Sequence, residues 1–212
     1  MEPDPQDERA PWDPARRQRR GYFTDEQLEA DYGTRPVPVD ATDPAGYAHV
    51  NLANCKNRFI HQNVEVAFGE GFGKVTSLAD MSAGDARVPR SLAEYSGIEP
   101  LLGDYFPGYQ FQGTLQETVP QIGVVDLYVC TNTIEHLNDP DADLKLIREH
   151  CRNLLLSCPI DEHDAGGQHL WFYSREGVED MFREAGFSQQ AYCELDENPV
   201  WEHFKFGIWA LS

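Results

Sequence analysis

Strand-like apolar runs and helix-like segments alternate from about residue 75 to the end of the chain, and this alternation limits the fold more than any other feature. The continuous apolar run VVDLYVCTN, 124–132, is typical of a central parallel strand that is buried on both faces. The last two strands are joined by the turn DENP and predict a hairpin. The pattern predicts an α/β fold with a seven-stranded, mostly parallel sheet, a C-terminal antiparallel hairpin and helices on both faces. The other expected strands are 74–81, 100–105, 109–115, 153–160, 188–195 and 199–212.

Helix start and stop signals lie between these strands. Asp139 is expected at an N-cap, with Pro140 at the first helical position. Ser174 is a second expected N-cap, and Gly186 closes the helix that follows it. Helices are therefore expected over 86–95, 139–151 and 174–187.

The residues before the alternating pattern divide into a tail and an arm. Residues 1–22 combine proline, acidic residues and an arginine cluster, which predicts a flexible tail. Residues 23–70 are expected to form an arm with helices that acts as a lid, and 71–212 the α/β domain. The arginine cluster is interpreted either as part of a solvated tail or as a contact for nucleic acid or an acidic partner. It comprises Arg16, Arg17, Arg19 and Arg20.

Composition narrows the functional classes. No stretch reaches the ~18 to 20 apolar residues of a membrane span, and the N-terminus lacks the apolar core of a signal peptide. Five scattered cysteines without CxxC spacing indicate free thiols in a reducing compartment, so a cytoplasmic location is expected. The net charge of −19 disfavours non-specific binding to a phosphate backbone.

The loop after the first strand of the α/β domain, DMSAGDA over 80–86, is a candidate ligand site because ligands bind beyond the carboxyl ends of such strands. It lacks the G-x-G-x-x-G pattern that cradles a pyrophosphate, and Asp80 and Asp85 would repel one. Two carboxylates instead suit a ligand with cationic groups and no phosphate, such as S-adenosylmethionine. Small residues let the backbone approach that ligand closely.

These residues resemble the first motif of class I S-adenosylmethionine-dependent methyltransferases, commonly (D/E)-x-G-x-G-x-G in a Rossmann-like fold. Asp80, Ser82, Gly84 and Ala86 match its spacing, and Ser and Ala fit in place of glycine as long as φ stays negative. The family's second motif, an acid that binds the ribose hydroxyls, is assigned to Asp104, with Glu99 as the alternative. The acid that the family often has near the adenine is replaced by Thr114, with Glu117 as a weak substitute. The resemblance implies a cofactor site formed by Asp80, Ser82, Gly84, Asp85, Asp104, Thr131, Asn132 and Arg58.

Two further segments extend the resemblance over 75–212. DLYVCTNTIEHLNDPDADLKLIREH is similar to the strand-four motif of small-molecule methyltransferases, and HLWFYSREGVEDMFREAGF is similar to the helix before strand six. His136, Glu135 and His169 are the candidate catalytic residues, with His136 as the general base for a hydroxyl acceptor; alternatively, Glu135 and His136 brace the loop. His169 and Trp171 are candidates to line the acceptor pocket, against a purely structural role. Arg58 is assigned either to the cofactor's methionine carboxylate or to a surface ion pair.

Metal and cysteine chemistry are not predicted. His163 and His169 lie in DEHDAGGQH, which fits no standard zinc spacing, so no metal site is expected. Cys130 and Cys158 lack the companion motifs of cytosine methyltransferases and are interpreted as small buried residues.

The sequence thus predicts an S-adenosylmethionine-dependent methyltransferase that acts on a small-molecule or sugar-like acceptor. One alternative is a non-catalytic protein of the same fold that binds a ligand or takes part in an assembly. A second is a nucleic-acid methyltransferase that uses the arginine cluster, although net charge disfavours it. The oligomeric state and the acceptor stay open.

Overall fold

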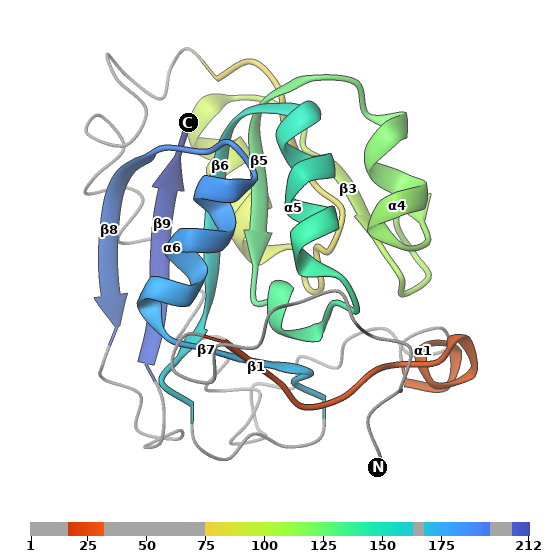
Figure 1. Cartoon of the computed structure of the whole chain (residues 1–212). Helices are drawn as coiled ribbons and strands as arrows, with labels where there is room; N and C mark the ends of the chain where they lie inside the picture. Colours follow the sequence, from red (N-terminus) through yellow and green to blue (C-terminus); the bar gives the residue numbers. More distant parts are fainter. Residues whose placement is uncertain (1–16, 32–74, 163–167, 196–204) are drawn as a thin grey trace, which may run out of the picture.

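The computed structural model describes residues 17–31, 75–162, 168–195 and 205–212 (Figure 1). Seven strands form one sheet in the order β4-β3-β2-β5-β6-β9-β8. The four pairs from β4 to β6 are parallel, and β9 pairs antiparallel with both β6 and β8. This confirms the predicted sheet with its C-terminal antiparallel hairpin. The strands are β2 (Leu78–Asp80), β3 (Leu101–Asp104), β4 (Phe111–Gln112), β5 (Val125–Thr131), β6 (Cys151–Ile160), β8 (Gln189–Leu195) and β9 (Lys205–Leu211).

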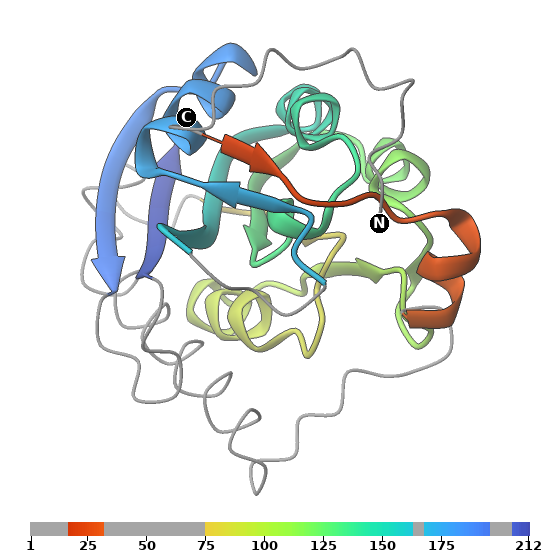
Figure 2. The ribbon, with the colours of Figure 1, turned by 60° about the horizontal axis from the view of Figure 1, so that its bottom comes forward.

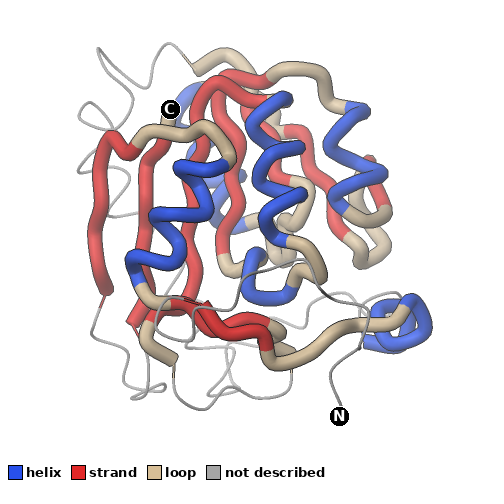
Figure 3. Tube along the Cα trace, viewed as in Figure 1, coloured by secondary structure: helices blue, strands red, loops and turns tan. Residues whose placement is uncertain are grey.

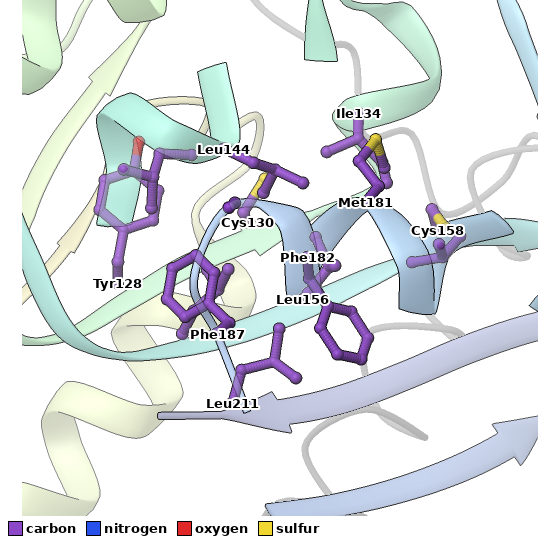
Figure 4. Packing of buried hydrophobic residues seen from close by; sticks show 14 of the residues in the cluster. Tyr128, Cys130, Ile134, Leu144, Leu156, Cys158, Met181, Phe182, Phe187 and Leu211 are labelled. Atoms are coloured by element: carbon purple, nitrogen blue, oxygen red, sulfur yellow. The ribbon is translucent and has the colours of Figure 1, made fainter. Parts of the chain in front are cut away.

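The two faces of the sheet bury alternate residues of each central strand. On β5, Leu127 and Val129 pack in a cluster with Val88 and Leu92 of α3 (Arg87–Ser96). Figure 2 shows α3 on the face opposite α5 (Pro140–Glu149) and α6 (Arg175–Glu184). The second face carries the larger cluster, in which side chains of β5, β6 and α6 pack together (Figure 4). Both faces are therefore apolar, as a continuous apolar run on β5 requires.

Local capping chemistry sets the ends of the helices. Asp139 Oδ1 accepts the Ala142 amide at 3.1 Å, and Ser174 Oγ accepts the Gly177 amide at 3.1 Å. Pro140 begins α5, and Gly186 follows α6 at φ 89°. The predicted helices therefore begin where their caps indicated.

The predicted strand over 109–115 is wrong beyond Gln112. Gly113 turns the chain at φ 144°, and Thr114 becomes the N-cap of α4 (Leu115–Thr118), which continues into the 3-10 turn η2 (Val119–Gln121). Thr114 and Glu117 form a capping box, in which the Thr114 amide donates to Glu117 Oε2 at 2.9 Å. The capping box therefore starts a helix at residues for which the alternation of apolar and polar side chains predicted a strand.

The predicted flexible tail through residue 22 is wrong for its last residues. β1 (Arg17–Arg19) pairs antiparallel with β7 (Trp171–Tyr173), and α1 (Asp25–Asp31) follows. Figures 1 and 3 show this strand pair beyond the carboxyl ends of β5 and β6. The rest of the predicted arm, 32–70, lies outside the described residues.

The arginine cluster is engaged within the chain where it is described. Arg17 Nη1 donates to both carboxylate oxygens of Asp141 at 2.7 Å. Arg19 lies over the Trp171 ring, 5.4 Å from its centroid, and Arg20 lies over Phe172 at 4.4 Å. These contacts correct the interpretation of the cluster as a solvated tail. Among the described helices, none has the length and apolar character needed to cross a bilayer.

Candidate functional site

The carboxyl ends of β2, β3 and β5 bring the sequence-predicted polar residues to one edge of the sheet. β2 ends in Asp80, β3 ends in Asp104, and β5 ends in Thr131 and is followed by Asn132. The chain runs from β2 outward to β3 and β4 and then returns to β5 on the other side of β2. The direction of winding therefore reverses at β2, which is where ligands bind in open α/β sheets.

The loop from Asp80 to Ala86 folds tightly on itself. Asp80 is 1% exposed, and its Oδ1 accepts the Ser82 amide at 2.9 Å and the Ser82 hydroxyl at 3.2 Å. Gly84 has φ 54°, and Ala86 has φ 57°. The condition under which alanine fits in place of glycine, a negative φ, is therefore not met at Ala86, which adopts a left-handed conformation that disfavours a Cβ.

Asp104 connects the end of β3 to this loop. Its Oδ2 accepts the Gly84 amide at 2.7 Å, and its Oδ1 accepts the Phe106 amide at 3.0 Å. Burial raises the pKa of Asp104, and the amides of Phe106 and Gly84 oppose that rise. The alternative acid, Glu99, is exposed and precedes the amino end of β3, so the geometry favours Asp104.

The residues after β5 lie against the same loop. The Thr133 hydroxyl donates to Ser82 Oγ at 2.8 Å. Asn132 has φ 55°; its amide donates to the Ser157 carbonyl at 2.8 Å, and its Oδ1 accepts the Ser157 hydroxyl at 3.3 Å. The loops after β2 and β5 are thus joined by a side-chain hydrogen bond, which no sequence motif indicates.

One predicted cofactor residue is instead paired at the start of α3. Asp85 pairs with Arg87 at 2.9 Å and accepts the Arg87 amide at 3.1 Å, at the start of α3. Arg58 lies outside the described residues.

Glu135, His136 and His169 form a second cluster at the same edge. Glu135 and His136 lie on the 3-10 turn η3 (Ile134–His136), and the His136 and His169 rings meet edge to face with centroids 4.8 Å apart. His136 Nδ1 lies 2.9 Å from the Gln168 carbonyl oxygen, and His169 Nδ1 lies 2.7 Å from Glu162 Oε2. Glu162 and Gln168 were not among the predicted site residues, because no motif or spacing links them to the histidines.

The electrostatics of the two imidazoles differ. Burial and, to a smaller extent, the neighbouring His169 lower the pKa of His136 to about 4, with the Gln168 carbonyl opposing them. His136 is therefore neutral at pH 7 and a weak base. Burial also lowers the pKa of His169, but the hydrogen bond to Glu162 and the charge of Glu135 outweigh it and raise the pKa overall.

The main chain around this cluster is held by hydrogen bonds to η3. The Leu170 amide donates to the Glu135 carbonyl at 2.7 Å, and the Tyr173 hydroxyl donates to the Ile134 carbonyl at 3.2 Å. Trp171 is 4% exposed and donates its indole N–H to the Leu137 carbonyl at 2.8 Å. Trp171 therefore braces the loop, which favours the structural alternative for this residue.

Cys130 and Cys158 are fully buried. Burial raises the pKa of the Cys130 thiol well above its usual value, which disfavours the thiolate that a nucleophile requires. This agrees with their interpretation as small buried residues.

No protein-family model matches the chain, and no curated protein matches it by sequence. Solved structures do match it. A SAM-dependent methyltransferase from Leishmania major is 18% identical with a TM-score of 0.60, covering 83% of this chain and 78% of that one. Magnesium protoporphyrin IX methyltransferase from Synechocystis with bound SAM is 12% identical with a TM-score of 0.55, over 79% and 81%. The N-terminal domain of EvdMO1, solved in the presence of SAH and D-fucose, is 13% identical with a TM-score of 0.51, over 81% and 83%.

One similar structure is described by a different chemistry. The [4+2]-cyclase SpnF is 10% identical with a TM-score of 0.54, and the match covers 65% of this chain and 74% of that one. At these identities the likeness concerns the fold and leaves the reaction to be argued from the site. The chain has the fold of class I S-adenosylmethionine-dependent methyltransferases.

Proposed function

We propose that this chain is an S-adenosylmethionine-dependent methyltransferase that acts on a small-molecule acceptor. The observation that carries the proposal is the pair of nearly buried carboxylates, Asp80 and Asp104, on either side of a small-residue loop at the point where the sheet winding reverses. The fold is that of proteins solved with SAM or SAH bound.

The residues at this edge fit the cofactor. Ser82 and Gly84 leave room for a ligand to approach the backbone, and Asp80 complements a sulfonium or ammonium group. Asp104 Oδ2 accepts the Gly84 amide and Oδ1 accepts the Phe106 amide, and a carboxylate has about four acceptor positions, so Asp104 can also accept a ribose hydroxyl. When bound, S-adenosylmethionine supplies an electrophilic methyl group.

We assign the acceptor side to Glu135, His136 and His169. Thr133 links their loop to Ser82, so this cluster and the cofactor loop border one site. The histidine side chains are 25% and 21% exposed, which leaves them accessible to an acceptor. A sugar-like acceptor suits this polar cluster, since its hydroxyls are hydrogen-bonding groups.

The main alternative is a non-methylating protein of the same fold. The left-handed conformation of Ala86 favours it, because the family motif carries a glycine there. Transfer of a radiolabelled methyl group from the cofactor to any of a panel of hydroxylated small molecules would exclude this alternative.

Calorimetry with S-adenosylmethionine, S-adenosylhomocysteine and NAD tests the proposal. We expect micromolar binding of the first two and none of NAD, with affinity at least ~10-fold weaker in Asp80→Asn and Asp104→Asn, since each loses a charge at the site. Asp180→Asn, on the exposed side of α6, is the matched control and should bind as the wild type. Absence of binding at millimolar concentration would overturn the proposal.

A further inference from the structure

Glu135, His136 and His169 place three potential metal ligands together. One ligand atom from each residue lies within 4.8 Å of the others, and His136 Nε2 lies 3.9 Å from Glu135 Oε1. Glu135 is 1% exposed, whereas both imidazoles reach solvent. A carboxylate thus lies beneath two imidazoles at an accessible edge of the sheet.

The hydrogen-bond partners of His136 and His169 both select the tautomer with the proton on Nδ1. The Gln168 carbonyl only accepts hydrogen bonds, so His136 Nδ1 carries the proton and Nε2 carries the lone pair. Glu162 imposes the same assignment on His169. A metal-binding histidine usually donates its Nδ1–H to a carbonyl or carboxylate in this way and turns its Nε2 toward the ion.

We propose that Glu135, His136 and His169 bind a divalent transition-metal ion through one carboxylate oxygen and two Nε2 atoms. Two imidazoles and a carboxylate suit Zn²⁺, Fe²⁺ or Co²⁺, whereas Mg²⁺ and Ca²⁺ prefer oxygen ligands. Three protein ligands leave at least one coordination position for water or a substrate oxygen. No metal site was predicted from the sequence because DEHDAGGQH, which contains His163 and His169, fits no standard zinc spacing; Glu135 and His136 come from a separate segment.

The cluster can close on an ion by side-chain rotation. Metal bonds of about 2.1 Å bring ligand atoms to roughly 3 to 3.5 Å from one another, so these side chains must approach by about 1 to 2 Å. The backbone is already fixed, since the His136 amide donates to the Thr133 carbonyl at 2.9 Å and the Leu170 amide donates to the Glu135 carbonyl. Only the last torsions of the three side chains need to change.

The site deepens the proposed function, on which this step rests, by indicating an oxygen acceptor. A hydroxyl bound to the ion becomes more acidic and is held beside the cofactor loop. Its oxygen then gives an electron pair to the methyl carbon, the carbon–sulfur bond breaks with its pair remaining on sulfur, and the hydroxyl proton leaves to water.

Metal titration of the untagged full chain, after removal of bound ions by a chelator, tests the site. We expect saturable 1:1 binding of Zn²⁺ by calorimetry, a visible absorption band with Co²⁺, and no competition from Mg²⁺. Glu135→Gln and His169→Ala should weaken Zn²⁺ binding at least ~100-fold, and Glu162→Gln ~10-fold through the loss of its hold on His169. His150→Ala is the control, because its Nδ1 also faces a backbone carbonyl, that of Leu146, outside the cluster.

Binding of S-adenosylhomocysteine by the same metal-free samples shows that each variant is folded and separates the two proposals. If the cofactor product binds but Zn²⁺ does not, the metal site is wrong and the proposed function stands. If Zn²⁺ binds but S-adenosylhomocysteine does not, the metal site stands and the proposed function is wrong. Equal Zn²⁺ affinity in His169→Ala, His150→Ala and the wild type would place the ion elsewhere and overturn the inference.

Discussion

At Gly84, backbone conformation alone determines which side chains the cofactor loop tolerates. A Cβ added there would meet no atom within 4 Å, but φ is 54°. We expect Gly84→Ala to lower the free energy of unfolding by about 1 kcal/mol. It should also weaken S-adenosylhomocysteine binding, because the Gly84 amide holds Asp104. Urea unfolding and calorimetry measure the two effects.

Gly123 provides the control for Gly84. It has φ 69°, and an added Cβ there would also meet no atom within 4 Å, but it lies in the turn before β5, at the opposite end of that strand from the site. Gly123→Ala should lose similar stability and keep the affinity of the wild type. If Gly84→Ala and Gly123→Ala both lose affinity for S-adenosylhomocysteine, the loss would come from lower overall stability rather than from a change in the cofactor loop.

The buried carboxyl group of Asp143 should make the free energy of unfolding depend on pH. It is 1% exposed on α5, and burial raises its pKa from 3.8 to about 7, with the charge of Asp139 adding to the rise and Gln116 opposing it. The folded state therefore holds the proton more tightly than the unfolded state. Below about pH 4, Asp143 is protonated in both states and does not lower the free energy of unfolding. Between its unfolded pKa near 4 and its folded pKa of about 7, rising pH progressively lowers the free energy of unfolding.

Asp143→Asn should flatten the stability curve over that range and raise the free energy of unfolding at pH 8 by up to about 4 kcal/mol. Urea unfolding between pH 4 and pH 8 measures this change. Asp180→Asn, whose partner is Arg183 on the surface of α6, should keep the slope of the wild type. An unchanged slope in Asp143→Asn would show that Asp143 ionises normally in the folded chain.

At the scale of elements, Gly103 determines how closely β3 packs between its neighbours. A Cβ there would lie 2.7 Å from Met81 Sδ, 2.9 Å from Phe111 Cβ and 3.0 Å from the Phe111 carbonyl oxygen. Met81 can rotate away, but the backbone of β4 cannot without changing the strand pair. We expect Gly103→Ala to cost 1 to 3 kcal/mol, a rough range for overpacking.

The same substitution should weaken cofactor binding because Asp104 is the next residue. Urea unfolding gives the stability, and calorimetry with S-adenosylhomocysteine gives the affinity. The double variant Gly103→Ala/Met81→Ala distinguishes the two contacts when it is compared with Met81→Ala alone, since truncating the buried Met81 itself costs stability. If Gly103→Ala costs nothing further in the Met81→Ala background, Met81 rather than β4 is the obstacle, which would contradict the expectation.

Local signals predicted most of the helices and strands, and the missed strands β1 and β7 are ones that local signals do not mark. The caps at Asp139 and Ser174 operate within one turn, so a short window of sequence contains all of their chemistry. β1 and β7 are three residues each and stabilise one another from distant parts of the chain. Neither has enough alternation to be identified as a strand without its partner.

For the whole molecule, charge is the dominant global property. The chain carries 36 acidic and 17 basic side chains, so its folded form concentrates a net charge of −19. Sodium chloride from about 10 mM to about 0.15 M shortens the screening length from roughly 30 to 8 Å. We expect this to raise the free energy of unfolding by about 1 kcal/mol, since self-repulsion opposes the compact state.

Urea unfolding across this range of salt checks the expectation. Choline chloride should have the same effect if screening is responsible, whereas a larger effect of sodium would indicate specific cation binding. Stability that falls with salt would mean that ion pairs such as Arg17–Asp141 outweigh the repulsion.

Short-range chemistry along the chain was sufficient to predict the α/β alternation, the helix caps, and Asp80 and Asp104 at the ends of adjacent strands. Each of these depends on residues a few positions apart, or on the rule that parallel strands end at one edge. Glu135, His136 and His169 were each predicted as site residues, but their contact with one another was not predictable from the sequence. His169 reaches η3 only because the segment leading into β7 hydrogen-bonds back to Glu135, and Glu162 orients it from the end of β6. Contacts between segments far apart in sequence leave no periodicity, so only the folded chain assembles them.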